Sequence, residues 1–316
     1  MPTALPRDAE RPLALAVRHI NASVPDPIDT ETLLSALGAH DKAGAEHLYA
    51  FFDEVEVETI SDLARSGAVT YGALARGARR CLPPDHPTRL WLMSAPDPQW
   101  RRLLDLALPA LDHVFGPGTD ETRPAPWTLG RGTALALWID HRISYDVDLF
   151  VPGVPLKRFT PQQNPAAARI SGTYQWPGHY LKYERPEGEI DFLSVVLQTE
   201  PGYAWMDHGA GRIPVETPEE ILVKKIRFRS ARFTARDVFD LAAAARARPA
   251  LAEVMAREVP DALERTLESL EHQARRNSDT LAHSIIPTAH AADLIAEAFP
   301  VGRRVLRDAI DLAERG

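Results

Sequence analysis

The segment 129–150 constrains the fold more than any other part of the chain, because it changes from strand to helix and back within a short distance. Trp127–Leu129 has the apolar character of a short strand, and Gly132–Trp138 has the small-residue composition of a helix. Val147–Val151 is an apolar run typical of a buried strand. A glycine turn and a polar loop join these elements. A chain with this order needs a sheet with helices packed against it.

Two further segments predict more strands. Ile190–Leu197 is rich in β-branched residues. Tyr180–Tyr183 is predicted to be the other arm of a hairpin whose turn is Arg185–Gly188. Residues 127 to about 200 therefore predict an α+β section built around a small sheet.

The segments on either side of this section have helical patterns. Before it, apolar residues recur at helical spacing in Leu33–Leu37, Ala45–Phe52, Ile60–Ala64 and Trp100–Phe115. After it, helices are predicted to begin at Thr217 and Thr234, because each threonine precedes an acidic residue by three positions, as in a capping box. Two more helices are predicted at Ala291–Phe299 and Val301–Arg315. The expected architecture is a mixed core with helical regions on both sides.

Breaks in these patterns suggest where the chain divides. Three prolines follow Cys81 closely, and Gly116–Pro126 has the composition of a loop. We therefore expect a helical region of unassigned role at residues 1–82, a mixed core at 83–205 and a C-terminal helical domain at 206–316.

Composition excludes several classes of protein. With 316 residues and 45% hydrophobic side chains the chain can bury a core, yet no apolar run approaches the roughly 18 residues that span a bilayer. The first residues lack the apolar region of a secretion signal. A single cysteine excludes a disulfide framework, and a net charge of −8 argues against a protein that coats duplex DNA. We expect a cytoplasmic protein.

Carboxylates and a glycine turn mark the candidate site. The turn at Gly130 and Gly132 precedes a helix, and backbone N–H groups at a helix start bind phosphate oxygens. Asp146 and Asp148 are two positions apart at a strand, so they are expected on one side of it, where a divalent cation would relieve their repulsion. Asp191 lies in an otherwise apolar strand and would need such a partner. Solvated aspartates at a strand edge are the alternative.

A cationic stretch follows at residues 224–236. On a helix, Lys225 and Arg229 share a face, and a lysine beside a triphosphate would stabilise transferred charge. A solvated basic helix is the alternative. Asp237 is a candidate site residue, and it can also close the capping box of Thr234. The glycine and histidine motifs of P-loop, dinucleotide-binding, α/β-hydrolase and zinc-protease sites are absent.

Four motifs together resemble a known family. They are Leu-Gly-x-Gly-Thr-Ala-Leu-Ala-Leu from residue 129, His-Arg-x-Ser-x-Asp-x-Asp-Leu-Phe from 141, Glu-Ile-x-x-Lys-Lys from 220 and Arg-Asp-x-Phe-Asp-Leu-Ala from 236. Their order and spacing, between about residues 100 and 245, are similar to those of the AbiEii/AbiGii nucleotidyltransferase toxins, which are relatives of the MenT toxins. These proteins are the toxin halves of type IV-style abortive-infection toxin–antitoxin pairs.

The resemblance implies a polymerase-β-like nucleotidyltransferase core, in which a small mixed sheet is covered by helices and followed by a helical domain. It also implies the use of Mg²⁺ and a nucleoside triphosphate, with transfer to tRNA 3′ ends in some members. It implies metal ligands at Asp146 and Asp148, with Asp191 as a third by strand position only. It also implies catalytic roles for Lys225 and Asp237. The residues implied in nucleotide binding are Gly130, Gly132, Thr133, Ser144, Lys224 and Arg236, and Arg131 in the same turn is a further nucleotide-binding candidate.

Arg131 departs from the family pattern, in which glycine usually stands between Gly130 and Gly132. If the position needs a positive φ, an arginine there is strained. Its side chain could instead reach a phosphate.

The sequence thus predicts an Mg²⁺-dependent transferase that joins a nucleotide to an RNA 3′-hydroxyl, engaged partly by the arginines of residues 227–236. A separately encoded antitoxin is the expected partner, and residues 1–82 could also regulate the enzyme. Transfer to a protein or small molecule and a non-catalytic nucleotide-binding scaffold remain alternatives. The choice of NTP, the acceptor and the oligomeric state stay open.

Overall fold

The structure is a computed structural model of the whole chain. It describes residues 10–38, 45–56, 59–60, 62–63, 69, 74, 77–78, 81–83, 85–94, 100–117, 121–185, 188–209, 211–276, 281 and 285–315.

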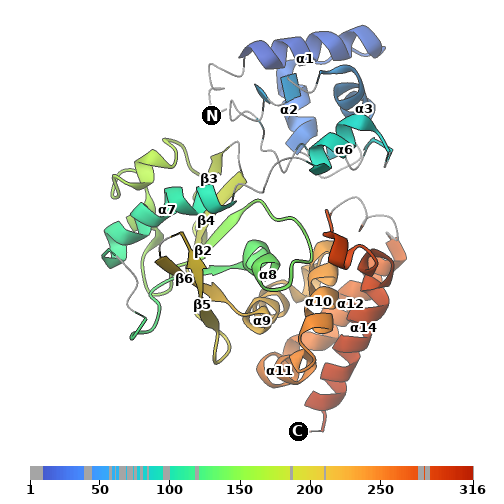
Figure 1. Cartoon of the computed structure of the whole chain (residues 1–316). Coiled ribbons are helices and arrows are strands. Elements are labelled where there is room, and N and C mark those ends of the chain that lie inside the picture. Colours follow the sequence, from blue (N-terminus) through green and yellow to red (C-terminus); the bar gives the residue numbers. More distant parts are fainter. Residues whose placement is uncertain are drawn as a thin grey trace.

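A mixed sheet forms the centre of the described structure (Figure 1). Its strands lie in the order β3-β4-β2-β1-β6-β5. β1 is antiparallel to β2 and parallel to β6, whereas β2 is parallel to β4. The fold is therefore α+β with a mixed sheet, as the sequence predicts. The strands are β1 (Thr128–Gly130), β2 (Val147–Phe150), β3 (Tyr180–Arg185), β4 (Gly188–Leu193), β5 (Tyr203–His208) and β6 (Gly211–Glu216).

The hairpin of β5 and β6 is the part of the sheet that the sequence did not predict. β5 is half-exposed along most of its length, and β6 contains Pro214, which has no N–H for a sheet hydrogen bond. β6 pairs with β1 at one position, Val215 with Leu129, and β5 lies at an edge of the sheet. The sheet therefore continues past residue 205 to Glu216. The division at 1–82, 83–205 and 206–316 stays a prediction, and its second boundary falls within β5.

The remaining strands follow the predicted pattern, except where β4 ends. β3 and β4 pair as an antiparallel hairpin, in register from Tyr180 with Leu193 to Arg185 with Gly188. β4 stops at Leu193, short of the predicted end at Leu197. Beyond it, the N–H groups of residues 198 and 199 donate to the carboxylate of Glu220. A buried side chain thus replaces the next strand as the acceptor.

Helices α7 (Trp100–Phe115) and α8 (Arg131–Ile139) pack against the sheet, α7 on β2 and β4 and α8 on β1, β2 and β6. α7 has its predicted bounds. Side chains of both helices belong to one apolar core with the strands, including Leu104, Leu135 and Phe192.

Helices α9 (Pro218–Arg229), α10 (Ala235–Ala247), α11 (Leu251–Glu258), α12 (Pro260–Arg276) and α14 (Leu294–Ala313) form the C-terminal part. Figure 1 shows α10, α11, α12 and α14 gathered beside α9. The predicted caps at Thr217 and Thr234 are confirmed.

The break predicted between residues 299 and 301 is wrong, because α14 continues through Pro300. Ala298 and Gly302 are buried on either side of the proline, in a stripe with Leu294, Leu306 and Ala309. The packing of this stripe holds the helix together despite the backbone hydrogen bond that proline removes.

The N-terminal region has a second apolar core of its own, which includes Leu13, Ile20, Phe51 and Phe52. The predicted helices around residues 33–37 and 45–52 are confirmed, whereas α1 lies in a segment that the sequence did not assign. The helix predicted at Ile60–Ala64 falls partly outside the described residues. The helices with printed bounds here are α1 (Glu10–Ser23), α2 (Thr30–Gly38), α3 (Ala45–Glu54) and α6 (Pro87–Ser94).

None of the helices in the described residues combines the length and the apolar character needed to cross a bilayer.

The turn between β1 and α8 brings backbone very close to other elements. A Cβ atom on Gly130 would lie 2.4 Å from Glu216 Oε2 and 2.4 Å from the Phe150 ring. A Cβ atom on Gly132 would lie 2.4 Å from Arg142 Nη2. Gly130 has an extended backbone with a φ of −132°, so close approach, and not a positive φ, requires glycine there.

We predict that Gly130→Ala lowers the free energy of unfolding by about 1–3 kcal/mol, because the new methyl group overpacks a buried site. Gly172→Ala is the matched control, since a Cβ atom there meets nothing within 4 Å. Urea unfolding followed by circular dichroism measures both. Equal stability of the two variants would contradict the close approach.

Candidate functional site

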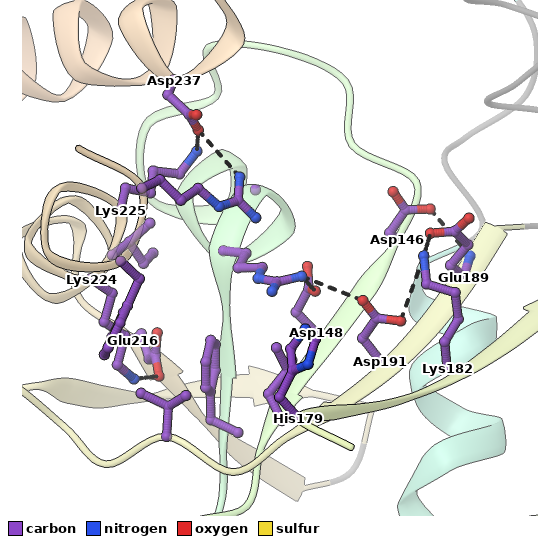
Figure 2. A pocket seen from close by; sticks show the side chains of 18 of the residues that line it. Asp146, Asp148, His179, Lys182, Glu189, Asp191, Glu216, Lys224, Lys225 and Asp237 are labelled. Carbon is purple, nitrogen blue, oxygen red and sulfur yellow. Dashed lines mark hydrogen bonds and ion pairs between the residues drawn. The ribbon is translucent and has the colours of Figure 1, made fainter. Parts of the chain in front are cut away.

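A cavity of about 1280 Å³ lies where β2 and β4 face α9 and α10. Figure 2 shows Asp148 and Asp191 toward one side of it and Lys225 and Asp237 toward the other. Gly130 and Thr133 are the predicted site residues that do not line it. Ten predicted site residues do line it: Arg131, Gly132, Ser144, Asp146, Asp148, Asp191, Lys224, Lys225, Arg236 and Asp237.

On the acidic side, Asp148 and Asp191 are register partners on the adjacent parallel strands β2 and β4. Residues paired in this way have their side chains next to each other on one face of the sheet. Arg131 lies between them: its Nη1 donates to Asp148 Oδ1 at 2.6 Å and to Asp191 Oδ2 at 3.4 Å. The positive charge that the two carboxylates require therefore comes from the chain itself.

Asp191 remains incompletely neutralised. Its Oδ1 is buried and accepts no hydrogen bond, and Lys182 Nζ lies 3.8 Å away. Burial and the neighbouring charge of Asp148 raise the pKa of the Asp191 carboxyl to about 7. This carboxyl can therefore exchange a proton near neutral pH.

Asp146 lies just before β2 and is turned toward β4. Its Oδ1 accepts the backbone N–H of Glu189 at 3.1 Å. Its backbone carbonyl oxygen accepts the hydroxyl of Thr133, which also lies 2.9 Å from Ser144 Oγ. Thr133 and Ser144 thus hold the loop that carries Asp146 against the start of α8.

The three aspartates provide oxygen ligands of the kind that Mg²⁺ prefers. The paired carboxylates of Asp148 and Asp191, with the orphaned Asp191 Oδ1, fit a divalent cation in donor type and in charge. In their present positions, however, the His, Cys, Asp and Glu side chains of the described residues form no group of three that could hold a metal ion. Asp146 is turned away, and the guanidinium of Arg131 binds the other two carboxylates.

The two lysines of the basic side form buried ion pairs, whereas Arg227 and Arg232 of the same stretch are exposed to solvent. Lys225 Nζ donates to Asp237 Oδ1 at 2.6 Å and to Asp240 Oδ2 at 2.7 Å. Asp237 also forms the capping box with Thr234, which confirms that interpretation, while its role as a functional residue stays a prediction. Burial would raise the pKa of Asp237, but the charges of Lys225 and Arg229 hold it below its usual value.

Lys224 lies on another side of α9 from Lys225. Its Nζ donates to Glu216 Oε1 at 2.6 Å, lies 3.0 Å from Glu220 Oε1 and stands 4.0 Å from the centre of the Phe150 ring. Lys224 therefore ties α9 to the strands β2 and β6, while Lys225 faces α10.

Asp240 is the centre of a buried network that sequence analysis did not assign to the site. Its carboxylate accepts Arg142 Nε at 2.7 Å and Arg142 Nη2 at 3.2 Å, and His141 Nε2 lies 2.7 Å away. Burial opposes ionisation, but Arg142 and Lys225 keep the pKa of Asp240 well below its usual range. Burial lowers the pKa of His141 and outweighs the effect of Asp240 on the ring.

Among the ionisable residues that line the cavity, five were not predicted from the sequence: Arg142, His179, Lys182, Glu189 and Glu216. Arg142 belongs to the same motif as Asp146 and Asp148, and this closeness in the sequence was the available signal. Lys182, Glu189 and Glu216 lie on strands without a chemical pattern, and His179 directly precedes β3.

We predict that Asp240→Asn lowers the free energy of unfolding by at least about 3 kcal/mol, because it leaves the buried guanidinium of Arg142 without the carboxylate that it binds. Asp293→Asn is the control: this side chain is 67% exposed and pairs with Arg246 at the surface, so this variant should stay close to the wild type in stability. Urea unfolding compares the two variants with the wild type. An Asp240→Asn protein within about 1 kcal/mol of the wild type would contradict this role.

Glu216 gives a prediction about pH. Burial raises its pKa from 4.5 to about 7 against the opposing charge of Lys224, so the folded state favours the neutral carboxyl. Between pH 4.5 and 7 the unfolded chain releases this proton and the folded chain retains it. The contribution of Glu216 is therefore present below pH 4.5 and is lost as the pH rises through 7, by up to about 3 kcal/mol.

Glu216→Gln removes this titration. The stability of the wild type minus that of Glu216→Gln is expected to fall between pH 5 and pH 8, measured by urea unfolding at each pH. A difference that does not change with pH, or that rises, would show that Glu216 is ionised in the folded protein throughout.

No family model matches this chain, and no curated protein matches it. Two solved structures are similar to it, each over 68% of this chain and at 15% sequence identity. One is a candidate nucleotidyltransferase from Helicobacter pylori, with 94% of that chain covered and a TM-score of 0.38. The other is JHP933 from Helicobacter pylori, with 91% covered and a TM-score of 0.36. At this level of likeness nothing follows for the activity of the present chain.

Proposed function

We propose that this protein is an Mg²⁺-dependent nucleotidyltransferase that transfers a nucleotide from an NTP to an RNA hydroxyl, at the 3′ end of tRNA. One observation carries the proposal: within one cavity, the carboxylates of Asp148 and Asp191 face the basic residues of α9 and α10, and the start of α8 contributes to the lining. The four motifs that resemble nucleotidyltransferase toxins supply residues to both sides.

The carboxylate side would act on the acceptor. The attacking hydroxyl oxygen forms the new bond to the α-phosphorus, pyrophosphate leaves, and the hydroxyl proton passes to Asp191. Asp191 suits this role because its Oδ1 accepts no hydrogen bond in the structure. Mg²⁺ held by Asp148 and Asp191, with Asp146 as the third carboxylate, would supply charge neutralisation at the phosphates.

The opposite side would hold the triphosphate. No side chain caps the start of α8, where Gly132 lines the cavity, so the N–H groups of this turn suit phosphate oxygens. Lys225, Arg229 and Arg236 line the same cavity from α9 and α10. Their positive charge would stabilise the negative charge that develops on the leaving pyrophosphate.

Two aromatic side chains support a nucleic-acid acceptor over a small molecule. Trp176 is 45% exposed and Phe228 is 59% exposed, although both are large and apolar, and both line the cavity. Exposed aromatic rings beside a basic surface stack on unpaired bases such as those at an RNA end. The cavity volume of about 1280 Å³ also exceeds the roughly 300–1,000 Å³ of usual small-ligand pockets.

The proposal includes a biological setting. The sequence motifs are similar to those of toxins that a cognate antitoxin holds in check, so this enzyme would be the toxin of such a pair. The reaction would take place in the cytoplasm, where NTPs and tRNA are found.

The test incubates the purified protein with each α-labelled NTP, Mg²⁺ and total bacterial RNA. We expect label on tRNA-sized RNA with one NTP preferred. Asp146→Ala/Asp148→Ala should lower the rate at least about 100-fold, because it removes charge from the reacting centre. Asp207→Asn is the matched control: its side chain is 93% exposed on β5, outside the cavity, and its rate should equal that of the wild type.

The other outcomes are informative. Label on the protein itself, or on a small molecule, would overturn the RNA acceptor and retain the transferase. NTP binding without transfer to any acceptor would leave a nucleotide-binding scaffold and overturn the proposed activity.

A further inference from the structure

Arg131 has a backbone conformation that is costly for its residue type. Its φ is +54°, in the left-handed region. In the described residues, Asp140 is the other non-glycine residue with a positive φ, and it ends α8 with a short polar side chain that tolerates this region. An arginine has no such tolerance and costs about 1 kcal/mol or more there. Contacts of its side chain must compensate for this cost.

The guanidinium of Arg131 occupies the place where positive charge is most needed. Its Nη1 binds one oxygen of Asp148 at 2.6 Å and one oxygen of Asp191 at 3.4 Å. These are the two carboxylates that stand next to each other across β2 and β4. A divalent cation bound to both carboxylates would need the same oxygens and the same positive environment, so the guanidinium and the ion cannot both be accommodated there.

The pairing is also open to exchange. The side chain of Arg131 is 31% exposed and lines the cavity, whereas the carboxylates are almost fully covered. The arginine can therefore leave toward the cavity while the strands keep Asp148 and Asp191 in register. Lys182, on the other side of Asp191, lies too far from Oδ1 for a hydrogen bond and does not replace the guanidinium.

We propose that Arg131 is a built-in competitor for the metal site: its guanidinium and a divalent cation exclude each other from the Asp148–Asp191 pair. The inference rests on the proposed function, because it concerns the carboxylates assigned there to Mg²⁺. Arg131 is a positioning residue in this scheme. It keeps the two carboxylates together while no metal ion is bound, and it sets how tightly the ion binds.

The test measures Mn²⁺ binding to the full chain, without nucleotide, from the loss of the free-ion signal in electron paramagnetic resonance. Arg131→Met removes the charge and keeps an unbranched side chain at the same positive φ. It should bind Mn²⁺ at least about 10-fold more tightly than the wild type, because the competing charge is gone. Arg131→Lys keeps a positive charge and should stay closer to the wild type than to Arg131→Met.

Two controls separate charge from backbone strain and from folding. Arg131→Gly removes both the charge and the strain, and its Mn²⁺ affinity should match that of Arg131→Met. Adding Asp148→Asn to Arg131→Met should abolish the gain. Thermal unfolding with and without Mn²⁺ checks folding, and Mn²⁺ should raise the midpoint of Arg131→Met more than that of the wild type.

Equal Mn²⁺ affinity of Arg131→Met and the wild type would overturn the inference. Equal gains in Arg131→Met and Arg131→Lys would also overturn it, because the charge would then be irrelevant. Neither readout involves nucleotide transfer. Transfer to RNA without a gain in Arg131→Met would sink only the role of Arg131, whereas a gain without transfer would sink only the proposed activity.

Discussion

The buried carboxylate of Asp240 is the interaction on which the site depends. It joins Arg142 and His141, from the loop after α8, to Lys225 on α9, and it belongs to α10 itself. Charges removed from water in this way must be paired, so the three elements can pack in few other arrangements. The position of Arg142 in turn requires Gly132, where a Cβ atom would collide with its guanidinium. The cavity between sheet and helices is a consequence of this network.

The same principle accounts for the charge balance of the site. Seven Lys or Arg and six Asp or Glu side chains line the cavity, and most of their charges meet inside the protein. Arg131 forms ion pairs with the carboxylates of the sheet, while Asp237 forms an ion pair with Lys225 between the helices α9 and α10. A charged ligand must therefore displace groups that are already paired within the protein, because most charges in the cavity have a partner. Such a site can discriminate between ligands, because a ligand binds only if its charge and shape replace the internal ion pair that it breaks.

Much of the fold could be predicted from the sequence, but the physical reason differs from one helix or strand to another. Local patterns are strong enough to act alone in three places: the helix Trp100–Phe115, the caps at Thr217 and Thr234, and the paired strands β3 and β4. The β5–β6 hairpin has no such pattern: β5 is half-exposed along most of its length, and β6 contains Pro214, which has no N–H for a sheet hydrogen bond. Its place in the sheet comes from the pairing of β6 with β1. Tertiary packing likewise carries α14 through Pro300.

The site divides in the same way between sequence and structure. The sequence by itself determined which chemical groups are available: a glycine turn before a helix, aspartates at strand positions and two adjacent lysines, since residue type and short spacing are local properties. Tertiary structure decided which of them meet. It placed Asp148 beside Asp191, sent Lys224 and Lys225 to different carboxylates and set the Arg131 guanidinium between two aspartates. Those pairings join residues far apart in the chain, and the balance between burial and charge that selects them exists only once the elements have packed.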